Sequence, residues 1–347
     1  MLKSNVAVFY TTENQRYTVD VSYLVYKKAT HIMKNSFFFL LIGILIISCK
    51  PYSSTTKTTT QPMTYSSFRQ LQKSYPSADG LIKYIDQGSG PVILLLHGVP
   101  SSGWLYRKMI TPLVKNGYRV IVPDMLGFGA SDSPTGYELY SSKHHSQRLL
   151  ALMDFLKIDN WAHVMHDAGG LWTWELLAQA PQRINRLILL NTIVFEEGFT
   201  PPIRMKPGFL AKTAMWSYRN GITTNMLLNG LFKAGIENNT LTKKDIEGYK
   251  TPLLEGKTKG MYYFFSKTCN DLPDYTAVFQ KISIPVAVIW GKNDSMLQWE
   301  PQKEKIINHL KVAPENIKLL NEKHFIQETK AEKISVAITR FLRANQL

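Results

Sequence analysis

Three residues of this chain, Asp167, Asp294 and His324, each come directly after a run that reads as a buried strand. Asp167 stands in VMHDAGGLWTWELL (residues 164–177), where an apolar run leads into the acid, two small residues follow, and a helix-like stretch begins. Small residues after such a turn let the helix pack closely while the side chain at its apex points out of the fold. The pattern is that of a nucleophile elbow with aspartate in place of serine, and the chain contains no G-x-S-x-G. An ordinary turn with Asp167 as a helix N-cap is the plainer interpretation.

The other two residues complete a possible triad. Asp294 lies in GKNDSM after the apolar run IPVAVIW, and His324 lies in NEKHFIQE after a short apolar run. The chain order is nucleophile, acid, histidine, one of the orders in which catalytic triads occur. Parallel strands end at the same edge of a sheet, so the three side chains could meet there. Glu196 or Glu197, after the run RLILL, is the rival acid.

A second motif, His97-Gly98-Val99-Pro100, follows the apolar run VILLL. We expect the backbone N–H groups of Val99 and Ala168 to face the elbow as an oxyanion hole, where one fixed donor is typically worth roughly 10²–10³ in rate. A simple Gly-Pro turn is the alternative interpretation. The remaining histidines, among them His144, His145, His163 and His166, lack a comparable setting, and we interpret them as structural or surface residues.

An aspartate nucleophile favours attack on tetrahedral carbon. Attack of a carboxylate on an acyl carbon gives an anhydride, which is a poor route to ester hydrolysis. Attack on an sp³ carbon displaces a leaving group or opens an epoxide and leaves an alkyl ester on Asp167. His324 would then activate water against the carbonyl carbon of that ester, and Asp294 would orient the imidazole and stabilise its protonated form.

Alternating strand-like and helix-like runs predict the framework that must hold these residues. Strands are expected at 81–86, 91–97, 118–123, 161–166, 186–190, 284–290 and 317–320, and helices at 105–115, 139–156, 169–180, 302–310 and 331–342. This alternation is the signature of an α/β fold with a mostly parallel sheet. Residues 196–275 interrupt it with prolines, glycines, aromatics and helix-like stretches. We expect them to form a helical cap over the strand ends.

Residues from about 81 to 345 resemble the haloalkane dehalogenase and epoxide hydrolase branch of the α/β-hydrolases. The resemblance rests on HGVPSSGWLYRKM, PDMLGFGASDSP, HDAGG, GKND and the late His324, all in order. It implies the α/β-hydrolase fold and a hydrolase that acts on a small apolar organic substrate with water, without cofactor or metal. Dehalogenases usually carry Trp where this chain has Ala168 and often Asn where it has Val99, so both usual halide donors are missing. One of the tryptophans Trp104, Trp172, Trp174 and Trp216 could substitute.

A haloalkane dehalogenase-like hydrolase is therefore one interpretation, and an epoxide hydrolase is the other. Epoxide hydrolases commonly use cap tyrosines as acids, and Tyr249, Tyr262 and Tyr263 are the candidates here, although aromatic residues in a cap more often serve packing. An ester or lactone hydrolase, or a non-catalytic surface lipoprotein that retains the fold, remain as weaker alternatives.

The N-terminal region indicates an envelope protein. Residues 33–49 read as a signal peptide that ends in Ile46-Ile47-Ser48-Cys49. This resembles a lipobox, so Cys49 is expected to carry the lipid of a membrane-anchored lipoprotein in a bacterial cell envelope; a secreted or periplasmic protein is the alternative. Residues 1–32 would be an extension or a mis-assigned start, 50–70 a Ser/Thr-rich tether, and 71–347 the enzyme domain. The net charge of +15 suits a basic surface or an anionic membrane, and no motif indicates nucleic-acid binding.

Overall fold

The chain divides into two compact units, Met1–Gln61 and Pro62–Leu347. The computed structural model describes residues 9–12, 15–18 and 63–345. In the first unit, β1 (Phe9–Thr12) pairs antiparallel with β2 (Gln15–Thr18). The expected signal peptide at 33–49, with Cys49, lies outside the described residues, as does most of the expected tether. Among the helices that are described, none is both long and apolar enough to cross a membrane.

The second unit is built on an eight-stranded sheet in the order β10-β9-β8-β7-β5-β6-β4-β3. Only the pairings of β3 with β4 and of β4 with β6 are antiparallel; the others are parallel. The central strand β7 is buried along its whole length, as expected for a strand covered on both faces. The strands are β3 (Lys73–Ser77), β4 (Gly80–Gln87), β5 (Val92–Leu96), β6 (Arg119–Asp124), β7 (Trp161–Asp167), β8 (Ile184–Thr192), β9 (Val286–Gly291) and β10 (Ile317–Leu320).

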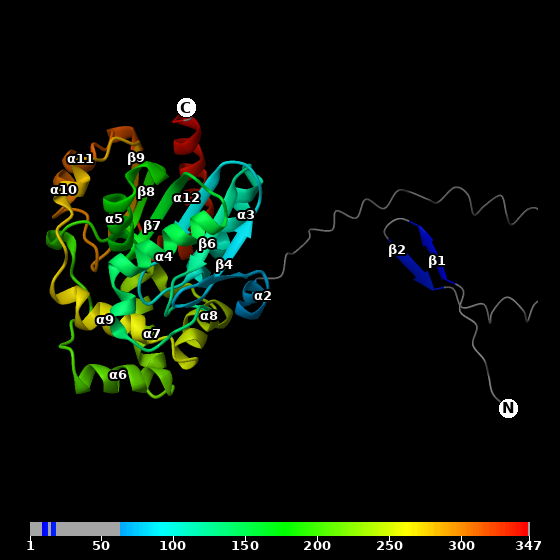
Figure 1. Ribbon diagram of the computed structural model, residues 1–347, viewed down its shortest axis with the longest axis horizontal. Helices are drawn as coiled ribbons and strands as arrows, with labels where there is room; N and C mark the ends of the chain where they lie inside the picture. Colours follow the sequence, from blue (N-terminus) through cyan, green and yellow to red (C-terminus); the bar gives the residue numbers. More distant parts are fainter. Residues whose placement is uncertain (1–8, 13–14, 19–62, 346–347) are drawn as a thin grey trace, which may run out of the picture. The chain divides into compact units, whose positions relative to one another are not determined.

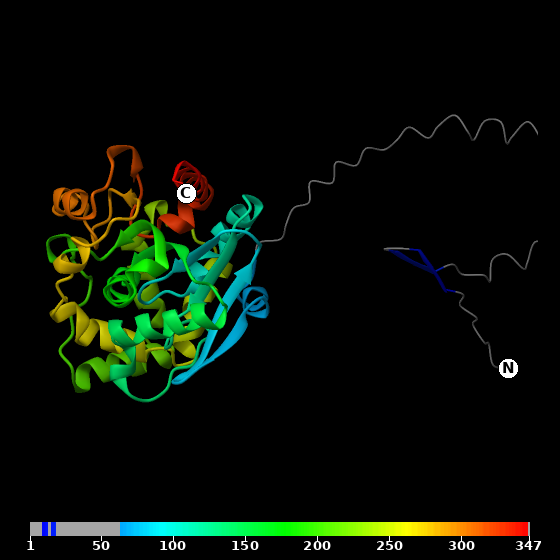
Figure 2. The ribbon, with the colours of Figure 1, turned by 45° about the horizontal axis from the view of Figure 1, so that its top comes forward.

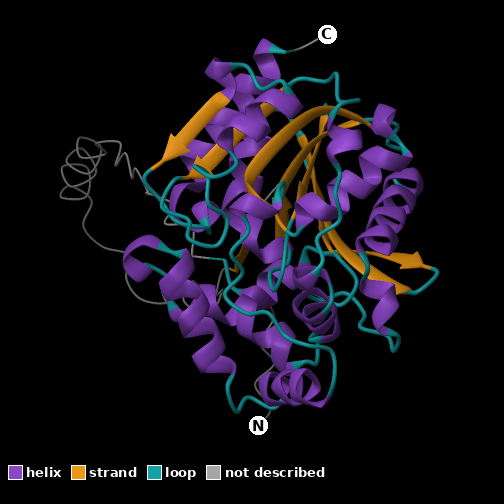
Figure 3. Ribbon diagram, turned by 90° about the vertical axis from the view of Figure 1, so that its left-hand side faces the viewer, coloured by secondary structure: helices purple, strands orange, loops and turns teal. Residues whose placement is uncertain are grey.

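Helices cover both faces of this twisted sheet (Figure 3). α3 (Arg107–Lys115) packs against α12 (Ile326–Ala344), and α4 (Ser142–Phe155) packs against α5 (Gly169–Gln179). α10 (Thr276–Phe279) contacts both α5 and α11 (Lys303–Leu310). The interior holds fully buried aromatic side chains, among them Trp161, Trp174 and Trp290. The predicted fold class, a mostly parallel α/β sheet with flanking helices, is confirmed.

Between β8 and β9 the chain forms no strand of the sheet. It forms α6 (Phe209–Arg219), α7 (Thr224–Gly235), α8 (Lys243–Leu254), α9 (Lys259–Ser266) and short 3₁₀ turns. These helices gather at one end of the unit in both views (Figure 1, Figure 2). We refer to residues 196–275 as the cap. Its α8 and α9 approach the core closely: Gly248 lies against Trp104, and Gly260 lies against Phe128.

The structure differs from the predicted elements at three places. The folded unit already includes α2 (Tyr65–Gln70), within the range expected to be tether, because the aromatic side chains of Tyr65 and Phe68 are buried in the core. The expected helix at 139–156 is divided, since the Ser141 side chain accepts a hydrogen bond from the His144 N–H and starts α4 afresh. α12 is interrupted at Lys330, whose φ of −132° and ψ of 29° are not helical, so the expected helix at 331–342 is its second part and a short first part begins directly behind His324.

Candidate active site

Asp167 occupies the apex of a tight turn between β7 and α5. Its φ is 52°, in the left-handed region, and its carbonyl oxygen accepts hydrogen bonds from Thr192 Oγ1 (2.8 Å) and the Ile193 N–H (3.1 Å). A Cβ on Gly98 would lie 2.3 Å from Asp167 Oδ1, and one on Gly170 would lie 2.4 Å from Thr192 Oγ1. Glycine is therefore required on both sides of the turn, as expected where backbone segments approach this closely.

Two backbone N–H groups favour the ionised Asp167 carboxylate. The Val99 N–H donates to Asp167 Oδ1 at 2.7 Å, and the nearby Ala168 N–H also lowers the pKa of this carboxyl. The buried His97 fixes the loop that carries Val99, because its Nε2 accepts from the Met125 N–H at 3.0 Å. Its Nδ1 must therefore hold the proton and donate to Gly98 O at 2.8 Å. Burial lowers the pKa of His97 to about 4, so the ring stays neutral in this role.

The two oxygens of the Asp167 carboxylate thus have different surroundings. Oδ1 accepts from the Val99 N–H, one of the two donors expected from the sequence, whereas Oδ2 faces His324 Nε2 at 3.6 Å. That distance is slightly longer than a direct hydrogen bond. The side chain is almost fully buried.

The opposite nitrogen of the imidazole is held by Asp294. His324 Nδ1 and Asp294 Oδ2 are 2.8 Å apart. The other oxygen of Asp294, Oδ1, accepts from the N–H groups of Met296 (2.8 Å) and Leu297 (3.1 Å). A carboxylate with this many donors is fixed in orientation. The structure therefore brings the three predicted residues into one chain of contacts, from Asp167 through His324 to Asp294.

Asn191 is a fourth member of this arrangement that the sequence analysis did not identify. It lies near the end of β8 with φ 34°, and its Nδ2 donates to Asp294 Oδ2 at 2.8 Å. Its own Oδ1 accepts from the Gly291 N–H at 2.8 Å, so the side chain ties β8 to β9 next to the acid. In the sequence, Asn191 could have been recognised as a polar residue directly after the apolar run RLILL.

Electrostatics couple the three titratable side chains. Burial alone would lower the pKa of His324, but the Asp294 carboxylate outweighs it, helped by Asp167, and the pKa is raised above its ordinary value of 6.5. Burial is the largest influence on Asp167 and raises the pKa of its carboxyl above 3.8, against the opposite effects of the imidazole and the two N–H donors. The result is an imidazole that favours its protonated form while both carboxylates are charged.

The rival acids lie elsewhere. Glu196 pairs with Arg204 at 2.9 Å, and Glu197 pairs with Lys305, both at the surface. Neither contacts the imidazole, so Asp294 is the acid that the fold provides. Within the described ranges, no group of three or more His, Cys, Asp or Glu side chains is arranged to hold a metal ion.

The three candidate cap tyrosines place their hydroxyl groups at three separate positions. Tyr249 donates to Glu328 Oε1 at 2.5 Å, Tyr262 OH accepts from the Gly208 N–H at 3.2 Å, and Tyr263 donates to Glu138 Oε2 at 3.4 Å. The tyrosine hydroxyls are therefore bonded to partners other than Asp167 and His324. The structure does not bring the three into one site.

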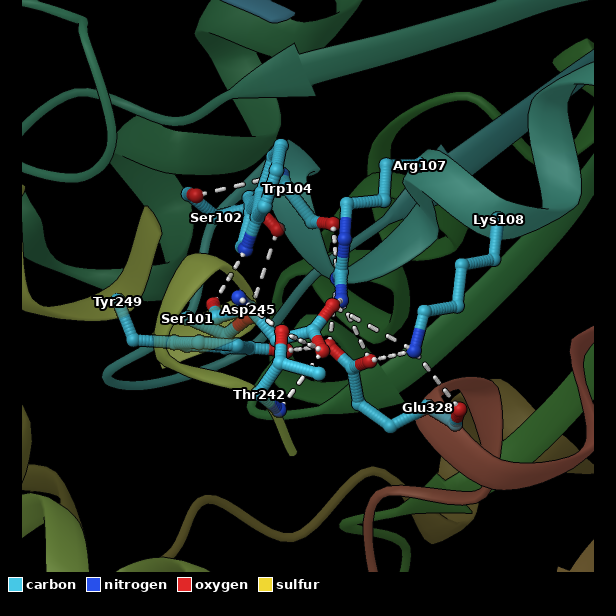
Figure 4. A network of polar contacts seen from close by, with 9 residues as sticks. All are labelled: Ser101, Ser102, Trp104, Arg107, Lys108, Thr242, Asp245, Tyr249 and Glu328. Carbon is cyan, nitrogen blue, oxygen red and sulfur yellow. Dashed lines mark hydrogen bonds and ion pairs between the residues drawn. The ribbon is translucent and has the colours of Figure 1, made fainter. Parts of the chain in front are cut away.

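Tyr249 belongs to a buried polar network that joins the cap to the core (Figure 4). Arg107 Nη1 and Nη2 bind Glu328 Oε1 and Oε2 at 2.6 and 2.7 Å, and Arg107 also pairs with Asp245 of α8. Lys108 Nζ contacts Glu328 Oε2 at 2.8 Å. Because Glu328 lies four residues after the site histidine, this network anchors both the cap and the start of α12.

The four candidate tryptophans also differ in position. The indole N–H of Trp104 donates to Asp245 O and that of Trp174 donates to Ile193 O, both at 2.9 Å, and Trp216 lies on the outside of the cap. The Trp172 ring is buried against His97, at 5.5 Å between centroids. The indole N–H of Trp172 donates a hydrogen bond to no acceptor among the residues that the structure describes.

Comparison with known proteins agrees with this geometry. A family model described as alpha/beta hydrolase fold matches residues 91–331. A haloalkane dehalogenase of Mycolicibacterium paratuberculosis is 28% identical over 276 residues, which cover 75% of this chain and 87% of that protein. A cis-3-alkyl-4-alkyloxetan-2-one decarboxylase of Shewanella oneidensis is 28% identical over 308 residues, 76% of this chain and 92% of that protein. The crystal structure of an epoxide hydrolase from Vigna radiata shares the fold with a TM-score of 0.64 at 22% identity, covering 79% of this chain and 98% of that one.

Proposed function

Because the chain belongs to the α/β-hydrolase fold family and is a hydrolase, we propose that it cleaves a bond at an sp³ carbon through an ester formed on Asp167. One observation carries this proposal: Asp167 Oδ1 lies on the backbone N–H of Val99 while Oδ2 faces the imidazole. One oxygen is thus held where a carbonyl oxygen can develop charge, and the other is left to act as the nucleophile.

The reaction proceeds in two steps. In the first, Asp167 Oδ2 attacks the substrate carbon from the side opposite the leaving group, a C–O bond forms, and the leaving group departs with the bonding electron pair. In the second, His324 Nε2 takes a proton from water, and the resulting hydroxide attacks the carbonyl carbon of the ester. Oδ1 becomes the oxyanion that the N–H groups of Val99 and Ala168 stabilise. When this intermediate collapses, the bond between its carbonyl carbon and the oxygen of the alkyl group breaks, and the imidazolium gives its proton to the departing alkoxide, which leaves as the alcohol. The Asp167 carboxyl then loses its proton to solvent, which restores the carboxylate.

The charges explain why the base becomes active after the ester has formed. While Asp167 is ionised, it helps to raise the pKa of His324. Formation of the ester removes that negative charge, so the pKa of the imidazole falls and a larger fraction becomes neutral and able to accept a proton. Asp294 keeps its contact with Nδ1 and stabilises the imidazolium in the second step.

The leaving group must be assigned from the hydrogen-bond donors that this chain offers. Ala168 and Val99 stand where the dehalogenases that this chain resembles carry their halide donors. Of the three buried candidates, Trp104, Trp172 and Trp174, only Trp172 has an indole N–H that donates to no carbonyl oxygen of the described residues, so it is our candidate donor. We favour a haloalkane over an epoxide because the cap tyrosine hydroxyls have other partners. The name of the Shewanella relative adds an oxetan-2-one to the substrates worth testing.

A substrate panel tests the proposal on residues 62–347, the compact unit that holds the whole sheet, the cap and the site. Short bromoalkanes, terminal epoxides and an oxetan-2-one are compared, with bromide release, diol formation or ring opening followed in each case. Turnover of any of them should be abolished by Asp167→Asn and unaffected by Asp271→Asn at the surface. Activity that survives Asp167→Asn contradicts the mechanism, and hydrolysis of nitrophenyl esters that survives Asp167→Ala supports an ester hydrolase.

We also propose that the protein is anchored in a bacterial cell envelope by a lipid on Cys49. The support is the sequence: an apolar run, the lipobox-like IISC and a Ser/Thr-rich stretch before the enzyme. Radioactive palmitate should label the full chain, and Cys49→Ser should abolish both the label and membrane association. Absence of label in the full chain refutes the anchor.

A further inference from the structure

The outer side of the cap exposes a cluster of large apolar side chains. Phe209, Leu210, Ile222, Met226 and Trp216 are 81, 82, 63, 68 and 57% exposed, more than any other large apolar residue of the described chain. They come from α6, the turn that follows it and the first turn of α7, and we name these five residues the cap face. Single exposed apolar residues are common on soluble proteins, but five of them on two helices that contact each other and on the turn between these helices indicate an interaction site.

The helix α6 carries large apolar side chains on its exposed side as well as on its buried side. Ala211, Met215 and Tyr218, spaced by four and three residues, form its buried side. Its exposed side carries Phe209 and Trp216 beside the basic residues Lys212 and Arg219. Figure 1 shows α6 as the outermost helix of the cap, with α7, α8 and α9 between it and the sheet. The cap face therefore belongs to the part of the unit farthest from its core.

The chain segment that carries the cap face has charges of one sign. Residues 198–236 include no Asp or Glu, but they include the five basic residues Arg204, Lys206, Lys212, Arg219 and Lys233. Arg204 pairs with Glu196. Lys206, Lys212 and Arg219, which precede or lie within α6, are exposed and form no ion pair with the described residues.

We propose that the cap face docks on the surface of an anionic lipid bilayer. A helix that presents Trp, Phe and Leu beside Lys and Arg is suited to the interface, where the apolar side chains enter the acyl boundary and the basic ones meet the headgroups. Anionic headgroups also attract each nearby basic residue. A second copy of this chain fits less well, because pairing two cap faces would bring positive charges together without acids to neutralise them.

Docking in this orientation has a consequence for substrate access. The cap adjoins the site histidine, since the N–H of Phe325 donates to Gly235 O at the end of α7 at 2.8 Å, and small apolar molecules concentrate in the bilayer. A docked cap would therefore meet the phase that holds such molecules. This consequence rests on the proposed function, whereas the docking does not.

Vesicle flotation of residues 62–347 tests the docking without any substrate. We expect binding to vesicles of equal parts phosphatidylcholine and phosphatidylglycerol, with much weaker binding to phosphatidylcholine alone. Leu210→Ser with Trp216→Ser should weaken binding at least about tenfold, since two apolar side chains no longer leave water. Lys212→Glu with Arg219→Glu should weaken it at least about 25-fold, from about fivefold for each lost basic residue.

Matched control variants lie outside the cap. Phe155→Ser with Val336→Ser changes two apolar residues of similar exposure, 52 and 50%, on α4 and α12. Lys333→Glu with Arg340→Glu reverses two exposed charges on α12. Both controls should bind within about twofold of the unchanged protein, as expected for surface substitutions. Thermal unfolding establishes that each variant is folded.

Three results would overturn the proposal. They are no binding of the unchanged protein to anionic vesicles, equal binding by the Leu210/Trp216 variant, and a dimer in light scattering that this variant converts to monomer without any vesicle binding. The last result would assign the cap face to a second copy of the chain. Since none of these measurements depends on turnover, an inactive Asp167 would leave them unaffected.

Discussion

Replacing the site histidine should stop the reaction halfway. In the structure His324 Nε2 lies 3.6 Å from Asp167 Oδ2, and the proposed attack on the substrate does not use the imidazole as a base. His324→Gln should therefore allow the ester to form but remove the base for its hydrolysis. Loss of a positioned general base costs typically about 10²–10⁴ in rate, so the ester should accumulate.

The structure also indicates that this variant folds. The Asp294 carboxylate loses its bond to His324 Nδ1 but keeps the donors from Asn191, Met296 and Leu297. One lost hydrogen bond to a charged group costs about 1.5–3 kcal/mol, which is less than the usual free energy of unfolding of about 5–15 kcal/mol. A urea titration of the variant beside the unchanged protein measures this difference.

The assay mixes the variant with a substrate that the unchanged protein turns over. We expect a single leaving group released per protein molecule and a peptide containing Asp167 that is heavier by the alkyl group in mass spectrometry. His309→Gln, which replaces a histidine outside the site, should turn over normally. Repeated turnover by His324→Gln, or an alkyl group on another residue, would refute the two-step mechanism.

Three further predictions concern neighbouring residues. Tyr249→Phe removes a hydroxyl from the cap network, so it should lower the free energy of unfolding by about 1.5–3 kcal/mol in urea titration. Turnover should fall less than about tenfold. A loss of turnover of about 10² or more would make this tyrosine a catalytic acid. Gly98→Ala places a Cβ 2.3 Å from the nucleophile and should abolish turnover, whereas Gly230→Ala, which meets nothing within 4 Å, should not; equal activities would contradict the site. Asp294 raises the pKa of His324, so NMR titration of this histidine should give a midpoint above 6.5. The midpoint should be lower in Asp294→Asn, because the protonated ring then loses its anionic partner. An unchanged midpoint would contradict the coupling.

Local sequence was sufficient for the elements nearest the chemistry. A strand that ends in Asp167 and is followed by Ala-Gly-Gly can form little other than a sharp turn into a helix, and β7 and α5 lie where the sequence placed them. The strand at Ile317–Leu320 was predicted with the same bounds. Short apolar runs with turn residues at both ends can be recognised from local sequence, because the run must be buried and the turn residues end it, although the partner strand lies elsewhere in the chain.

The sequence was less informative wherever an element is defined by what it packs against. The segment Tyr65–Gln70 follows a polar stretch and was assigned to the tether, yet Tyr65 and Phe68 pack edge-on to Trp104, at 5.5 and 5.3 Å between ring centroids. The edge strand β3 has a mixed polar pattern and becomes a strand only because β4 pairs with it.

The residue types and their order along the chain thus determined the fold class, the turn at Asp167 and the candidate set of Asp, His and Asp. Tertiary structure alone decided between Asp294 and the two glutamates, because β8 and β9 must lie side by side before Asn191 can hold one carboxylate against His324. It also decided that the hydroxyl of Tyr249 faces Glu328, a partner 79 residues away in the chain. Such a contact depends on how α8 of the cap packs against the start of α12, and no local pattern of the sequence encodes that packing.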